Sequence, residues 1–76
     1  MSRNNVIVVV EYFGRYYVLV NINADKPWTS PNWLRRVIRH RPFVKTRARA
    51  LVLAHDLQRR CDTEYGVREV CATPWR

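Results

Sequence analysis

Two consecutive runs of β-branched and aromatic residues near the N-terminus constrain the fold of this 76-residue chain most strongly. They span residues 6–12 and 16–22, and Phe13-Gly14-Arg15 between them supplies a short turn in which Gly14 can adopt a positive φ. The pattern predicts an antiparallel β-hairpin. Because side chains alternate along a strand, both faces of this hairpin are apolar near the strand centres. A sheet that is covered on one side only needs one apolar face. The second apolar face of this hairpin must therefore be covered by something else.

The strand pleat divides the expected hairpin into two sets of side chains. The first strand places Val6, Val8, Val10 and Tyr12 on one face and Ile7, Val9 and Glu11 on the other, and the second strand divides into Tyr16, Val18, Val20 and Ile22 against Tyr17, Leu19 and Asn21. Another segment of the chain covers the second face, or a second copy does. We therefore consider a homodimer formed through the sheet face or through a sheet edge.

Two helices and a closing strand are expected after the hairpin. Ser30-Pro31 is typical of a helix start, and the apolar residues that follow have helical spacing up to Arg41-Pro42, although residues 33–40 also fit an alternating strand. The main helix is predicted over about residues 46–61, with Thr46 as its N-cap and apolar positions at Ala50, Leu53, Ala54, Leu57 and Cys61. Residues 67–71 read as a short strand, and residues 72–76 as a loose tail.

These elements predict a single α+β domain over residues 1–76. Its small antiparallel sheet, made of the β-hairpin and the C-terminal strand, packs against one main helix, with a short helix or strand at residues 31–40 near the sheet edge or on its other face. No segment is long and apolar enough to cross a bilayer, because the longest apolar run, residues 6–10, has five residues.

Basic charge is concentrated in one part of the chain. The chain has 14 Lys and Arg residues against 6 Asp and Glu residues, a net charge of +8. All of that excess lies between Lys26 and His55, where no carboxylate occurs. Arg side chains and aromatic rings together are typical of nucleic-acid binding and of protein interfaces. The predicted contact residues are Trp28, as an exposed aromatic anchor in a loop, with Arg35, Arg36, Arg39, Arg41, Lys45, Arg47 and Arg49.

The residues that carry catalysis or bind metals form no recognisable pattern. His55 and Asp56 are adjacent on a helix, so their side chains diverge and cannot form a catalytic pair. Cys61 and Cys71 do not have zinc-ligand spacing with the histidines, and we interpret both as buried thiols rather than as a disulfide. We expect no enzyme, metal or cofactor. A metal-dependent hydrolase that uses Asp56, Asp62, Glu64 and Glu69 is a distant alternative.

The order of short motifs adds a resemblance to a known group of proteins. Tyr16-Tyr17-Val18, then Thr46-Arg47-Ala48-Arg49-Ala50, then Asp62-Thr63-Glu64-Tyr65-Gly66-Val67 resemble, over about residues 12–70, short phage and prophage proteins with a hairpin, a helix and a closing strand. Among these, the chain is similar to anti-CRISPR proteins in size and in its lack of enzymatic residues. Several such proteins are acidic DNA mimics, and a chain of charge +8 cannot act in that way.

The resemblance implies a non-enzymatic inhibitor or adaptor that acts in the host cytoplasm. Such a protein occupies a surface of a host nucleic-acid-handling complex, and the basic charge implies that it meets RNA, DNA or an acidic protein surface there. The alternative hypothesis is a regulator that binds DNA or RNA by itself and uses the same basic residues. Neither hypothesis involves a membrane.

Overall fold

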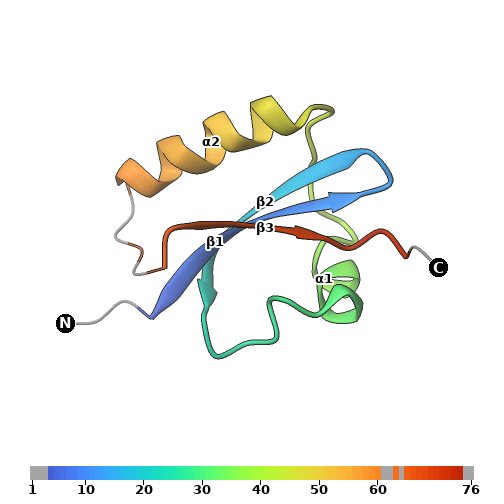
Figure 1. Ribbon diagram of the computed structural model, residues 1–76, viewed down its shortest axis with the longest axis horizontal. Helices are drawn as coiled ribbons and strands as arrows, with labels where there is room; N and C mark the ends of the chain where they lie inside the picture. The colour runs from blue at the N-terminus through green and yellow to red at the C-terminus, as the bar shows by residue number, and fades with distance from the viewer. Residues whose placement is uncertain (1–3, 61–62, 64, 75–76) are drawn as a thin grey trace.

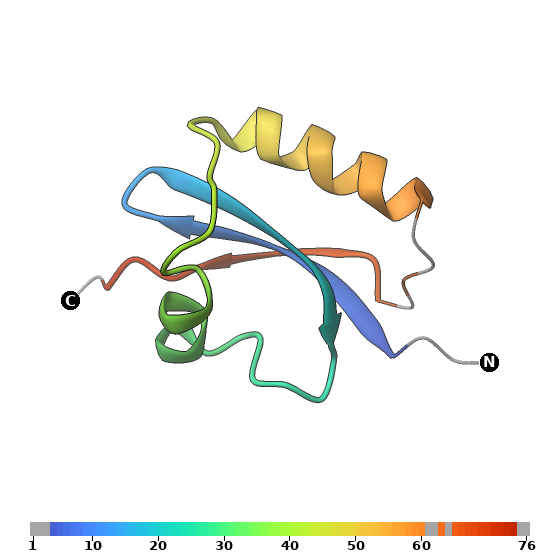
Figure 2. The same ribbon diagram turned by 180° about the vertical axis from the view of Figure 1, so that it is seen from behind.

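Two helices cover the two apolar faces of the N-terminal hairpin. The computed structural model describes residues 4–60, 63 and 65–74, and its elements follow the chain as β1 (Asn5–Tyr12), β2 (Arg15–Asn23), α1 (Pro31–Val37), α2 (Arg47–Arg60) and β3 (Val67–Cys71). The strands form one sheet in the order β2-β1-β3. Helix α2 lies over one face of this sheet and α1 over the other (Figure 1), as the view from behind also shows (Figure 2). The predicted α+β class and the main helix are confirmed.

The closing strand differs from the expectation in its direction. Strands β1 and β2 pair antiparallel, with Tyr12 opposite Arg15, whereas β3 pairs parallel with β1, from Ile7 opposite Val67 to Glu11 opposite Cys71. The sheet is therefore mixed. The cause is the path of α2, which begins at the hairpin end of the sheet and ends near the start of β1 (Figure 1). A strand that follows α2 must run in the same direction as β1.

A bulge in β2 changes which face its last residues occupy. Val6 pairs with Ile22 and Val8 pairs with Leu19, so β2 has one more residue than β1 in this interval. Val18 and Val20 pack on the α2 side, but Ile22 packs on the α1 side. The predicted face of Ile22 was wrong, because strict alternation does not continue through a bulge.

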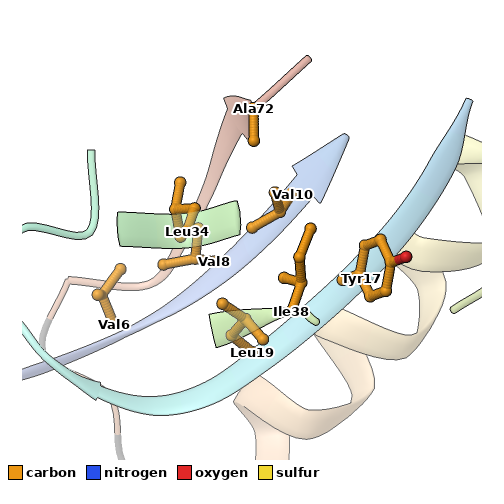
Figure 3. Packing of buried hydrophobic residues seen from close by; sticks show 8 residues of the cluster. All are labelled: Val6, Val8, Val10, Tyr17, Leu19, Leu34, Ile38 and Ala72. Carbon is orange, nitrogen blue, oxygen red and sulfur yellow. The ribbon is translucent and has the colours of Figure 1, made fainter. Parts of the chain in front are cut away.

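The core consists of one cluster on each face of β1. The α1-side cluster contains Val6, Val8, Val10, Tyr17, Leu19, Leu34, Ile38 and Ala72 (Figure 3). On the other face, α2 contacts Ile7 and Val9 through the fully buried Ala50 and Ala54, whose small side chains let the helix approach closely. Both sheet faces are thus covered within one chain, and a homodimer stays a prediction that the core does not require.

Side-chain caps begin both helices where the sequence predicts them. The Ser30 hydroxyl accepts a hydrogen bond from the Trp33 N–H at 3.4 Å, and the Thr46 hydroxyl accepts one from the Arg49 N–H at 3.2 Å. The alternative strand at residues 33–40 was wrong. Helix α1 also ends earlier than predicted, at Val37, and the chain continues in a turn in which the Arg41 N–H donates to the Ile38 carbonyl at 3.0 Å.

Two predictions for the C-terminal part were wrong. Ala72 and Thr73 are buried rather than part of a loose tail, because the chain continues beside the end of β1 after β3, where the Ala72 N–H donates to the Glu11 carbonyl at 2.7 Å. Cys71 is an exposed free thiol, since β3 is an edge strand at this point. Cys61 lies outside the described residues, as do residues 75–76.

Candidate nucleic-acid interface

The basic stretch of the sequence extends from one face of the sheet to the other. It runs along α1, then through residues 38–46, which we call the connector, and into the first turn of α2. The connector passes the edge of β2 near the hairpin turn (Figure 2). Two backbone hydrogen bonds of 2.9 Å between Tyr16 and Val44 attach it there. The predicted contact residues therefore do not form one flat surface.

Two arginines of α1 and one at the start of the connector line a single open hollow. Arg35, Arg36 and Arg39, which we call the arginine cluster, surround it together with Asn32. Arg35 is half-buried and held in place, because its Nη1 donates to the Ala72 carbonyl at 2.8 Å and its Nη2 donates to the Asn32 Oδ1. Arg36 and Arg39 are exposed. No carboxylate in the described part of the chain pairs with any of the three, so the hollow is positively charged.

The connector carries further cations around an exposed aromatic ring. Arg41 and Lys45 are exposed, and the Arg41 Nε donates to the Val37 carbonyl at 3.3 Å. Phe43 lies between them in the sequence. The Arg15 guanidinium carbon lies 4.7 Å from the centre of the Phe43 ring, a cation–π contact. Sequence reasoning missed Arg15, because it lies in the hairpin and outside the basic stretch.

Arg47 and Arg49 belong to α2, which lies on the other face of the sheet from α1, and they differ in their ion pairing. The Arg47 guanidinium binds both carboxylate oxygens of Glu69 on β3, at 2.7 and 2.9 Å. This hydrogen-bonded pair, and then the charge of Glu69, raise the pKa of Arg47 above its usual value. Arg49 is exposed, and no carboxylate among the described residues pairs with it. Arg47 therefore links α2 to β3, whereas Arg49 is free to meet a ligand.

Trp28 is not the exposed anchor that the sequence suggested. It is half-buried and packs against the α1-side cluster, because the loop after β2 folds back under α1. Lys26 in the same loop is exposed. The aromatic side chains that the structure does expose are Phe13, Phe43 and Tyr65, with 60%, 41% and 41% of their surfaces accessible.

Phe13 occupies an unusual position at the hairpin tip. The turn between β1 and β2 has two residues, Phe13 and Gly14, with φ values of 50° and 78°. Positive φ at both positions defines a type I′ turn, which favours Asn-Gly, Asp-Gly or Gly-Gly. The sequence signal was a phenylalanine at a turn position where Asn, Asp or Gly is usual. The prediction treated Phe13 only as part of a turn.

The described residues contain no arrangement for metal binding, with no group of three or more His, Cys, Asp and Glu side chains close enough together. Of the four carboxylates considered in the sequence, Asp56 and Glu69 form ion pairs with arginines, and Asp62 and Glu64 lie outside the described residues. In the part of the chain that the structure describes, no helix has the length and apolar character needed to span a bilayer.

Comparisons with known proteins leave the site to be interpreted from its own geometry. No protein-family model matches the chain, and searches of curated proteins and of solved structures also gave no match.

Proposed function

We propose that this protein acts without catalysis and binds nucleic-acid phosphates in a host nucleic-acid-handling complex. The observation that supports the proposal is the arginine cluster, in which three guanidinium groups line one hollow without a carboxylate partner in the described part of the chain. Guanidinium groups bind phosphate oxygens through paired hydrogen bonds. A surface whose cations are not neutralised by the protein itself gains affinity when it displaces counterions from a nucleic acid.

The arrangement around Arg35 favours a defined site over a diffuse charge. Arg35 is fixed by Ala72 and Asn32, so part of its rotamer entropy is already lost before a ligand binds. Arg36 and Arg39 beside it are exposed and supply the phosphate contacts. Arg41 and Lys45 on the connector extend the same positive surface toward the edge of β2.

The proposed biological role is that of a phage-encoded inhibitor or adaptor in the host cytoplasm. It agrees with the resemblance to anti-CRISPR proteins and with a charge that excludes DNA mimicry. A regulator that binds DNA or RNA by itself would use the same arginine cluster, and the affinity for free nucleic acid distinguishes the two roles. The inhibitor needs its host complex for tight binding, whereas the regulator binds naked nucleic acid tightly at physiological salt.

The proposal is tested by fluorescence anisotropy with labelled oligonucleotides over a range of salt concentrations. For single strands, each lost phosphate contact changes the slope of log K against log salt concentration by about 0.7. The double substitution Arg36→Gln and Arg39→Gln should therefore make the slope shallower by about 1.4, which is two contacts at about 0.7 each. Arg47→Gln is the matched control, because Glu69 already pairs with this arginine, and it should leave the slope unchanged.

Two results would contradict the proposal. One is wild-type binding that does not depend on salt. The other is a double variant of Arg36 and Arg39 with the wild-type slope. The host complex is tested separately by capture on the immobilised protein from host lysate. Capture should be lost when the lysate is treated with nuclease, and capture that resists nuclease would indicate a protein surface as the partner.

A further inference from the structure

Phe13, at the tip of the hairpin, combines a strained backbone conformation with an exposed apolar side chain, and the packing of the fold does not explain either. Its φ of 50° lies in the left-handed region, which a bulky side chain rarely adopts, and 60% of its surface is exposed. Asn or Gly at this position would avoid both the backbone strain and the exposed apolar surface. Within the described chain, the ring makes an edge-on contact with Tyr12, with 4.7 Å between the ring centroids. Residues held in strained conformations often serve a function.

The tip is also held rigidly. The Phe13 N–H donates to the hydroxyl of Thr73 at 2.8 Å, and Thr73 is buried. The turn is thus attached to the segment after β3 as well as to its own two strands. The hydrogen bond fixes the backbone that carries the ring, so less conformational entropy is lost when the ring binds a ligand.

The segment after β3 places Phe13 and the arginine cluster at the same end of the molecule. The Ala72 carbonyl accepts from Arg35, and the next residue, Thr73, accepts from Phe13. The hairpin turn, α1 and the end of β3 all lie at this end (Figure 1). Two consecutive residues, Ala72 and Thr73, therefore attach Arg35 of the arginine cluster and the backbone of Phe13 to one short segment.

We infer that Phe13 stacks on an unpaired base of a single-stranded nucleic acid whose phosphates the arginine cluster binds. The inference rests on the proposed function and specifies its ligand. An aromatic ring beside cations without carboxylate partners is the combination that binds single strands, because the base stacks on the ring and the phosphates meet the cations. A duplex offers no free base face, since its bases stack on each other. An apolar protein pocket would suit Phe13 too, but the arginine cluster at the same end of the molecule favours a polyanion.

The substitution Phe13→Asn tests the inference without threatening the fold. Asn suits the first position of a type I′ turn, so the variant should be at least as stable as the wild type. Its affinity for a single-stranded oligonucleotide should fall about 5- to 150-fold, the range expected for the loss of one base–aromatic stack. The salt slope should not change, because no phosphate contact is lost. Affinity for a duplex of the same sequence should also stay the same.

Two further variants serve as controls. Phe13→Trp keeps an aromatic face and should retain single-strand affinity. Tyr65→Asn removes another exposed aromatic ring, at the opposite end of the sheet beside Asn5, and should bind single strands like the wild type.

The outcomes separate this inference from the proposed function. If Phe13→Asn binds single strands like the wild type, or loses duplex affinity equally, the stacking role is wrong. The phosphate-binding proposal then still stands, provided that the double variant of Arg36 and Arg39 makes the salt slope shallower. If the wild type binds no oligonucleotide in a salt-dependent way, both are overturned.

Discussion

Replacing Leu34 with alanine should destabilise the whole domain and displace the arginine cluster. Leu34 is fully buried in the α1-side cluster, between α1 and the sheet (Figure 3). It belongs to a helix of seven residues. A helix this short is not stable by itself in water, so its position depends on the apolar side chains that attach it to the sheet. Leu34 and Ile38 are the two buried residues that do so.

The expected loss follows from burial. Leucine-to-alanine substitutions at fully buried sites cost about 3–5 kcal/mol, and less where the surroundings collapse into the cavity. Because α1 is an outer layer that can shift toward the sheet, we expect a loss near the lower value, about 3 kcal/mol. For a chain of 76 residues the total free energy of unfolding is about 4–11 kcal/mol, so this loss is a large fraction of it.

Urea unfolding measures the effect. Trp28 and Trp33 pack against the same cluster, so their fluorescence reports its disruption, and far-UV circular dichroism reports the loss of secondary structure. The two transitions should coincide, with the midpoint shifted to lower urea. Leu53→Ala is the matched control, since it makes the same chemical change at a half-buried residue that lines an open groove. Its effect should be clearly smaller. A loss of less than about 1 kcal/mol for Leu34→Ala, or an equal loss for Leu53→Ala, would refute the role of Leu34 in holding α1.

Two smaller predictions concern contacts that join distant parts of the chain. Thr73→Val keeps the side-chain shape but removes the acceptor of the Phe13 N–H, so it should cost about 1–3 kcal/mol in urea unfolding and speed hydrogen exchange at Phe13. An unchanged exchange rate would show that Thr73 does not hold the hairpin tip. In a double-mutant cycle with Arg47→Gln and Glu69→Gln, the coupling energy should be favourable at about 0.01 M NaCl and shrink toward zero at about 1 M. A coupling that does not depend on salt would contradict an exposed ion pair.

The elements that local chemistry specifies agree with the prediction. The two runs of β-branched residues form the hairpin, and Ser30 and Thr46 cap the helices, because strand alternation and capping depend on residues a few positions apart. The need to cover both sheet faces also followed from the sequence. The concentration of basic charge in one stretch of the chain was visible there too.

The candidate site was predicted only in part. The three arginines of the arginine cluster do share one hollow, but Arg47 is bound by Glu69 and Trp28 packs against the core. These outcomes depend on residues more than twenty positions away in the sequence, or on how a loop folds back. The sequence predicted a positive φ for Gly14 but not for Phe13, whose conformation follows from the two-residue length of the turn. Its connection to the arginine cluster passes through residues 72–73 and was not predicted either.

The sequence by itself therefore determined which segments become strands and helices, that both sheet faces need cover, and which segment carries the positive charge. Only the tertiary structure decided the direction of β3, the burial of Ala72 and Thr73, and the division of the basic residues between two layers. The physical reason is that periodicity and capping act within one or two turns of chain. Strand order, ion pairing and burial arise from contacts between distant segments, and those contacts exist only once the helices have packed on the sheet.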